Sequence, residues 1–160
     1  MIDKKYYLEL IKNYKPKENI NEKYIFTYIF KNEKNTQNFI NYASQYLGFK
    51  IYDVNMKDKN AVEKFIYGIY HSQAVITNSF HGTIFSIIFN KPFISFIFKN
   101  SPKERFISLK ETLNINNRVF EYNQKPNVNL LKTPLKINHT LLNSLKRQSI
   151  NYLKQNLKIK

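Results

Sequence analysis

The sequence has no cysteine and only three glycines among its 160 residues. The absence of cysteine excludes a disulfide framework, thiolate metal sites and a cysteine nucleophile. The glycines stand far apart, so neither a GxGxxG fingerprint nor a Walker A loop is present. No window has the roughly 18–20 consecutive apolar residues that span a bilayer, and the start MIDKKYYLEL lacks the apolar core of a signal peptide. We therefore expect a cytoplasmic protein.

Negative charge is also scarce: 11 acidic residues stand against 26 basic ones, which gives a net charge of +15. The basic residues are 23 Lys and 3 Arg beside 22 Asn. This indicates a compositional bias rather than selection for phosphate-binding guanidinium groups, so we expect no nucleic-acid binding. Residues 99–160 alone carry a net charge of +10. The positive charge of this C-terminal part favours binding of anionic substrates or contact with the acidic inner face of a membrane.

What the sequence does contain is an alternation of short apolar segments, with 13 Phe and 12 Tyr to build a core. Expected strands cover residues 23–30, 49–55, 74–78, 92–98 and 118–122, and expected helices cover residues 36–47, 60–70, 83–90 and 101–113. This order predicts an α/β fold, a Rossmann-like parallel sheet with helices on both faces. We expect a helix and linker at 1–22, a Rossmann-like domain at 23–137, and a helix at 138–160 that packs on this domain or on a partner domain.

Three expected helix ends carry recognisable signals. Gly48 follows one helix as a C-terminal stop. Asn60 with Glu63 three residues later predicts a capping box. Ser101, followed by Pro102 and Glu104, predicts an N-cap, a first-turn proline and a capping glutamate.

The segment Ala74–Phe98, AVITNSFHGTIFSIIFNKPFISFIF, is the centre of the chain because a polar turn separates its first strand from its helix. Open α/β sheets bind ligands at such strand-to-helix turns. If Asn78 or Ser79 caps the helix, the free N–H groups that follow carry partial positive charge. His81 adds a donor or a titratable positive charge.

Gly82 lets an anion approach the backbone of this turn, and Thr83 adds a hydroxyl donor. The turn is therefore a candidate site for a phosphate or a carboxylate. The alternative is purely structural: the polar residues only cap a buried helix, and His81 is an ordinary hydrogen-bonding residue.

Four other side chains, from two arginines and two histidines, are candidates for a functional or a structural role. Arg105, early in the helix after the fourth strand, lies near the same edge of the sheet and fits either the site or a surface ion pair. His71, His139 and Arg118 are expected to be structural or on the surface. No two histidines share a helical face, and the acidic residues are scattered, so no metal site is expected.

The run AVITNSFHGTIFSIIFNKPFISF and the later ERFISLKETLNINNRVFEY resemble the C-terminal half of the polysaccharide pyruvyl transferase family, with its T-D-S-F-H-G-T-x-F-S motif. The resemblance extends over about residues 20–155. The matching residues are Thr77, Ser79, Phe80, His81, Gly82, Thr83, Phe85, Ser86, Lys91, Pro92, Phe93, Arg105, Ser108, Leu109, Leu113 and Arg118. Asn78 stands where the family usually has Asp.

The resemblance implies a GT-B-like enzyme of two Rossmann-like domains, of which this chain is the second, with residues 23–137 as the donor-binding domain. Such transferases move the pyruvyl group of phosphoenolpyruvate onto a sugar of a cell-surface polysaccharide, forming a ketal and releasing phosphate. It implies His81 as the catalytic residue, phosphoenolpyruvate and a saccharide acceptor as partners, a missing or separate N-terminal domain, and no cofactor. The residues implied to bind the substrate are Asn78, Ser79, Phe80, Gly82, Thr83 and Arg105.

Two other functions stay open from the sequence. A glycosyltransferase-like domain would bind a nucleotide-sugar at the same edge of the same scaffold, with Glu104 as the one nearby carboxylate for a ribose. A non-catalytic remnant would instead bind an anionic glycan or a protein partner.

Overall fold

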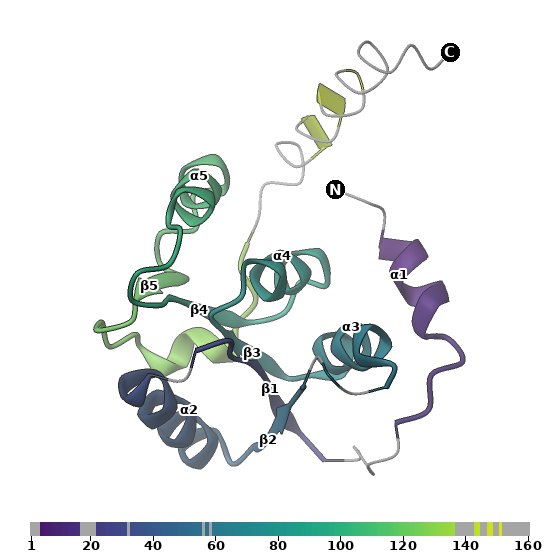
Figure 1. Ribbon diagram of the computed structural model, residues 1–160, viewed down its shortest axis with the longest axis horizontal. Coiled ribbons are helices and arrows are strands. Elements are labelled where there is room, and N and C mark those ends of the chain that lie inside the picture. The colour runs from purple at the N-terminus through teal and green to yellow at the C-terminus, as the bar shows by residue number, and fades with distance from the viewer. Residues whose placement is uncertain are drawn as a thin grey trace.

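The computed structural model describes residues 4–16, 22–31, 33–55, 57, 59–136, 143–144, 147–148 and 151. Its strands are β1 (Tyr24–Tyr28), β2 (Lys50–Asp53), β3 (Ala74–Thr77), β4 (Phe93–Ile97) and β5 (Val119–Glu121). Its helices are α1 (Lys4–Ile11), α2 (Lys34–Leu47), α3 (Ala61–His71), α4 (Phe80–Ile88), α5 (Glu104–Leu113) and the 3₁₀ helix η1 (Val128–Lys132). The strands form one parallel sheet in the order β2-β1-β3-β4-β5 (Figure 1). The predicted α/β fold is confirmed.

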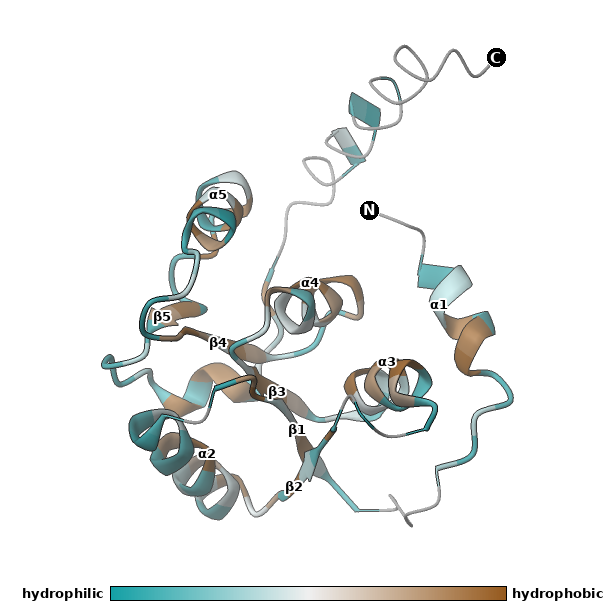
Figure 2. Ribbon diagram, in the orientation of Figure 1, coloured by the Kyte–Doolittle hydropathy of each residue, from teal (hydrophilic) through white to brown (hydrophobic). Residues whose placement is uncertain are grey.

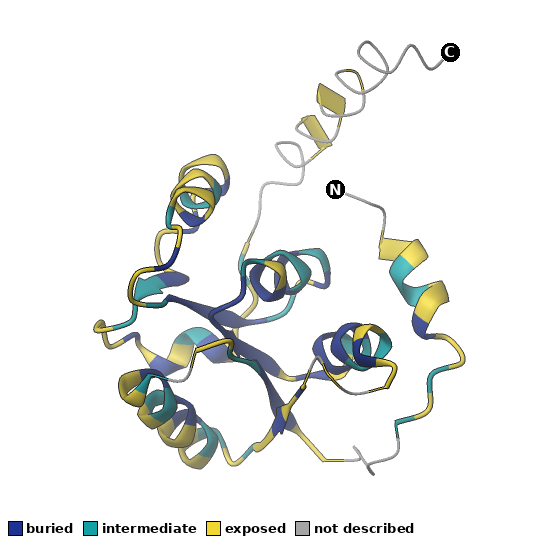
Figure 3. Cartoon of the chain, in the orientation of Figure 1, coloured by how far each residue is buried: buried dark blue, intermediate teal, exposed yellow. Residues whose placement is uncertain are grey.

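The central strands are apolar on both faces because helices cover both faces of the sheet. All residues of β3 and β4 are buried, whereas the edge strand β2 buries only Tyr52 (Figure 3). The hydropathy colouring shows the same contrast between the central strands and the outer surfaces of the helices (Figure 2). Exposure of β2 on one side is what an edge position predicts.

Two hydrophobic clusters lie on opposite faces of the sheet. The larger joins the sheet to α1, α3, α4 and α5, and includes Phe65, Phe89 and Phe106. The smaller joins the other face to α2 and η1, and includes Ile40 and Leu131. This asymmetry follows from right-handed crossovers: the chain turns towards β2 through α2 and runs back past β1 through α3.

The helix boundaries correct two predicted caps. Gly48 ends α2 in the left-handed conformation, as predicted, with φ of 66°. Asn60 precedes α3 with φ of 59° and makes no side-chain cap, so the predicted capping box is wrong. Ser101 is not the N-cap of α5 either, because α5 begins at Glu104 after Lys103. Sequence signals for a cap depend on backbone angles that the sequence does not reveal.

The remaining predictions concern the two ends of the chain. The helix predicted at 138–160 falls almost wholly outside the described residues, and the division of the chain at 22 and 137 stays a prediction. Residues 124–136, for which the sequence predicts neither a helix nor a strand, contain η1. None of the helices in the described ranges is long and apolar enough to cross a membrane.

Candidate functional site: the turn between β3 and α4

The predicted turn lies at the point in the sheet where the strand order reverses. The chain passes from β1 to β2 on one side and from β3 to β4 on the other, so the carboxyl ends of β1 and β3 form the switch point of the sheet. In open α/β sheets this crevice is where ligands bind. Residues Tyr28–Lys31, from the last residue of β1 onwards, and Thr77–His81, from the last residue of β3 into α4, therefore border the candidate site (Figure 1).

Thr77 is the residue around which the turn is built. Its hydroxyl donates to the carbonyl of Tyr28 (2.7 Å) and accepts from the N–H of Ser79 (3.0 Å). Gly82 lies directly against it: a Cβ on Gly82 would lie 2.6 Å from Thr77 Oγ1 and 2.9 Å from Thr77 Cγ2. The space left by this glycine is thus filled by Thr77, and it allows the start of α4 to approach β3 closely.

Ser79 is the N-cap of α4. Its Oγ accepts from the N–H of Gly82 (3.3 Å), and its carbonyl accepts from both the N–H and the hydroxyl of Thr83 (3.0 Å each). The hydroxyl of Thr83 already donates its single proton to Ser79, so the hydroxyl of Ser95 on β4 must be the donor in the 2.6 Å hydrogen bond between Ser95 and Thr83. Ser79, Thr83 and Ser95 are all buried, and their hydrogen bonds fix the start of α4 against β4.

Asn78 joins the turn to the loop that follows β1. Its side chain is only 2% exposed; its Oδ1 accepts from the N–H of Phe30 (2.8 Å) and its Nδ2 donates to the carbonyl of Lys31 (3.0 Å). An amide can make both bonds, whereas an ionised carboxylate can only accept. Asn78 therefore holds the β1–α2 loop beside the turn, and Phe30 is left 63% exposed at the switch point.

The groups that face solvent at the turn are few. His81 is exposed and Phe80 is partly buried. Four N–H groups at this helix start, those of Ser79, Phe80, His81 and Gly82, have no intrahelical acceptor. The N–H of Ser79 donates to Thr77 Oγ1, and that of Gly82 donates to Ser79 Oγ. For Phe80 and His81 no N–H acceptor is found within the described residues. The positive end of α4 thus carries two free donors beside an exposed imidazole.

Arg105 reaches the same surface through Phe80. Its guanidinium carbon lies 5.0 Å from the centre of the Phe80 ring, a cation–π contact. The same ring is 6.4 Å from the imidazole of His81 and 5.5 Å from Phe106 in the core. Phe80 is thus anchored on one side and lies beside both the imidazole of His81 and the guanidinium of Arg105, so the predicted residues His81, Phe80 and Arg105 come together.

The other predicted ligand-binding residues build the turn. The side chains of Asn78, Ser79 and Thr83 are buried and make the internal hydrogen bonds described above. Their direct contact with a substrate stays a prediction. The observed geometry gives them a different task, which is to hold the free N–H groups and His81 in place.

Arg118 and His71 lie away from this turn. Arg118 is 4% exposed and donates to the backbone carbonyls of Phe93, Leu130 and Thr133, so it fastens the η1 segment to β4. Burial lowers the pKa of this guanidinium. The His71 ring is 4.2 Å from that of Tyr67, at the amino-terminal edge of the sheet. Arg118 is structural, as the sequence analysis expected.

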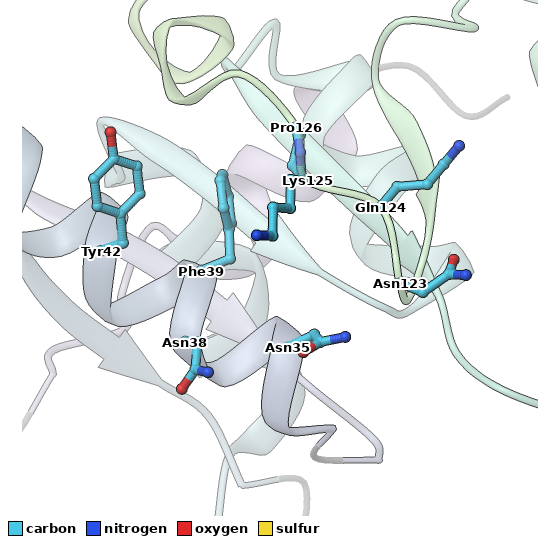
Figure 4. A pocket seen from close by; sticks show the side chains of 8 residues that line it. All are labelled: Asn35, Asn38, Phe39, Tyr42, Asn123, Gln124, Lys125 and Pro126. Atoms are coloured by element: carbon cyan, nitrogen blue, oxygen red, sulfur yellow. The ribbon is translucent and has the colours of Figure 1, made fainter.

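A groove distinct from the turn lies elsewhere on the domain, and neither place holds a cluster of metal ligands among the described residues. No group of three His, Cys, Asp or Glu side chains that could hold a metal ion occurs among the described residues. A separate groove lies between α2 and residues 123–126, on the other face of the sheet (Figure 4). The sequence analysis missed it, although four of its lining residues recur at helical spacing in α2.

The fold and the turn define a doubly wound α/β domain with a candidate site at its switch point. The family model for polysaccharide pyruvyl transferase matches residues 2–100, well over half of the chain. The chain belongs to this family of transferases, and the resemblance read from the sequence is confirmed. The match includes the whole turn but ends before Arg105 and Arg118. No curated protein and no solved structure gives a significant match.

Proposed function

We propose that this chain binds phosphoenolpyruvate and forms the donor half of an enzyme that transfers its pyruvyl group to a cell-surface polysaccharide. The observation that carries the proposal is the exposed His81 beside two free N–H groups at the start of α4, within the part of the chain that the family model matches. Phosphoenolpyruvate has two anionic groups, a phosphate and a carboxylate. The turn offers donors of positive potential for such groups.

The two anionic groups need two partners. The N–H groups of Phe80 and His81, with the dipole of α4, suit one of them. The guanidinium of Arg105 suits the other because its planar fork bonds both oxygens of a carboxylate or phosphate. The ring of Phe80 lies against Arg105 and limits the positions that this long side chain can take.

The reaction itself requires one proton acceptor and one proton donor. Protonation of the methylene carbon makes the adjacent carbon electrophilic, and two hydroxyls of one sugar then form C–O bonds to it while the C–O bond to phosphate breaks. One hydroxyl proton ends on the new methyl group and the other on the released phosphate, so the step needs no cofactor. We assign the proton transfer at the donor to His81, since imidazole exchanges protons readily near neutral pH.

The acceptor side of the site belongs, in this proposal, to an N-terminal domain in a GT-B-like arrangement. The proposed cleft lies at the carboxyl edge of the sheet, where Phe30 is exposed. Burial of such an aromatic side chain against a second domain would exclude water from the donor. The proposed place of action is the cytoplasm, at the inner face of the membrane, where the net charge of +15 favours anionic partners.

Calorimetric titration with phosphoenolpyruvate tests the donor assignment. Wild type should bind, His81→Ala should bind at least tenfold more weakly, and the matched control His71→Ala should bind like wild type. A nucleotide-sugar titrated in parallel should not bind. Failure of phosphoenolpyruvate to bind, or binding that His81→Ala leaves unchanged, would remove the donor site from this turn.

A further inference from the structure

We propose that the groove between α2 and the segment after β5 binds an anionic oligosaccharide, outside the donor site. The groove has a volume of about 380 Å³. One wall is a single face of α2, with Asn35, Asn38, Phe39 and Tyr42 at the spacing i, i+3, i+4 and i+7. The opposite wall is the loop of residues 123–126, and Figure 4 shows the side chain of Lys125 directed towards Phe39.

The chemistry of the walls is that of a sugar site. Four carboxamides line the groove, from Asn35, Asn38, Asn123 and Gln124, and each can both donate and accept hydrogen bonds, as sugar hydroxyls do. Gln124 uses its oxygen to accept from the N–H of Glu121 (2.7 Å), which fixes the amide and leaves its NH₂ group as a donor. Aromatic rings supply the apolar faces on which the C–H side of a sugar packs.

The same chemistry continues along α2 beyond the groove, which indicates an extended ligand. Tyr42 and Tyr46 are 50% and 48% exposed, and their rings lie 5.8 Å apart. The hydroxyl of Tyr46 donates to Asn129 Oδ1 (3.3 Å), and Lys132 Nζ lies 4.7 Å from the centre of the Tyr46 ring. An amide, an aromatic ring and a lysine therefore recur at the far end of the helix face.

The charge of this surface selects the kind of oligosaccharide. Lys125 lines the groove and Lys132 lies beside Tyr46 further along α2, and none of the described residues that line the groove carries a carboxylate. A chain with carboxylate groups is therefore favoured over a neutral one. The groove opens at the carboxyl edge of the sheet, like the turn before α4, but on the opposite face. As a binding site for the acceptor polysaccharide this inference rests on the proposed function.

Binding to a printed array of neutral and carboxylate-bearing oligosaccharides tests the inference with the full chain. We expect the chain to bind carboxylate-bearing members. In calorimetry with the strongest of them, Tyr42→Ala should weaken binding about tenfold, which corresponds to about 1.4 kcal/mol. Lys125→Ala should weaken binding and reduce its dependence on salt. The matched control is Tyr6→Ala, since Tyr6 is 62% exposed on α1.

The outcomes separate this groove from the donor site. His81→Ala should bind the oligosaccharide like wild type, and Tyr42→Ala should bind phosphoenolpyruvate like wild type. The inference is wrong if no oligosaccharide binds, if Tyr42→Ala and Tyr6→Ala bind equally, or if a single-stranded oligouridylate binds the groove as tightly. A chain that binds the oligosaccharide through Tyr42 but does not bind phosphoenolpyruvate would overturn the donor assignment alone. The thermal midpoint of each variant is measured alongside binding. Because the side chain of Tyr42 is half exposed, we expect Tyr42→Ala to keep the thermal midpoint of the wild type.

Discussion

Gly82→Ala is the substitution that most sharply tests how the turn is built. An added Cβ would lie 2.6 Å from Thr77 Oγ1, 2.9 Å from its Cγ2 and 3.1 Å from its Cβ. Thr77 cannot rotate away without loss, because its hydroxyl bonds both Tyr28 and Ser79. The start of α4 must then move off β3. This movement would displace the free N–H groups of the proposed donor site.

The size of the effect follows from two opposing contributions. Overpacking of a buried contact costs about 1–3 kcal/mol, and alanine gains up to about 1 kcal/mol over glycine within a helix. We therefore expect Gly82→Ala to lower the free energy of unfolding by about 1–2 kcal/mol. Thr77→Ala removes the two nearest atoms, so in that background Gly82→Ala should be close to neutral.

A double-mutant cycle measured by urea unfolding provides the assay. The coupling energy between Gly82→Ala and Thr77→Ala should be about 1–2 kcal/mol. Gly68→Ala is the control, because its Cβ would meet Phe26 instead (2.5 Å) and its effect should add to that of Thr77→Ala. A neutral Gly82→Ala, or a cycle without coupling, would refute the close contact between α4 and β3.

Three further substitutions have definite expected results. Asn78→Asp should lower the free energy of unfolding by about 3 kcal/mol at neutral pH, because its carboxylate would face the carbonyl of Lys31. This loss should become smaller towards about pH 4, since burial raises the pKa of the new carboxyl group and its protonated form can donate to that carbonyl. A loss of stability that does not depend on pH would contradict this. Arg118→Ala should cost about 3 kcal/mol by urea unfolding, because the carbonyls of Phe93, Leu130 and Thr133 lose their donor. An effect under about 1 kcal/mol would contradict its structural role. The pKa of His71 is lowered mainly by burial and also by Lys91, so its contribution to stability is present above about pH 6.5 and is lost as the pH falls. His71→Gln should therefore make the thermal midpoint depend less on pH between about pH 7 and about pH 5. A midpoint that changes with pH as much as in the wild type would contradict this.

The order of helices and strands could be predicted from the sequence because it depends on local patterns. The strands are apolar runs bounded by turn residues, and the helices repeat apolar residues at helical spacing. Gly48 was predictable as a helix end because it takes a left-handed conformation, which glycine adopts without strain. The caps at Asn60 and Ser101 were not, because each depends on backbone angles set by the neighbouring loops.

The location of the candidate site could also be predicted, since it follows from the alternation of strands and helices and from the polar turn. The contacts within it could not. Asn78 bonds residues 48 and 47 positions away in sequence, and Phe80 meets Arg105 across two elements. The groove beside α2 needs the loop after β5 as its second wall. Such long-range pairings depend on tertiary packing, which no local pattern encodes.

The central claim is that the start of α4 binds an anionic donor through its free backbone groups. An NMR titration of the ¹⁵N-labelled chain with phosphoenolpyruvate tests this claim most directly, because it reports on each amide separately. We expect the amide signals of Phe80 and His81 to shift most and to saturate together, while those of Gly82 and Thr83, already bonded to Ser79, move less. Shifts confined to other parts of the chain, or no saturable shift at Phe80 and His81, would contradict it.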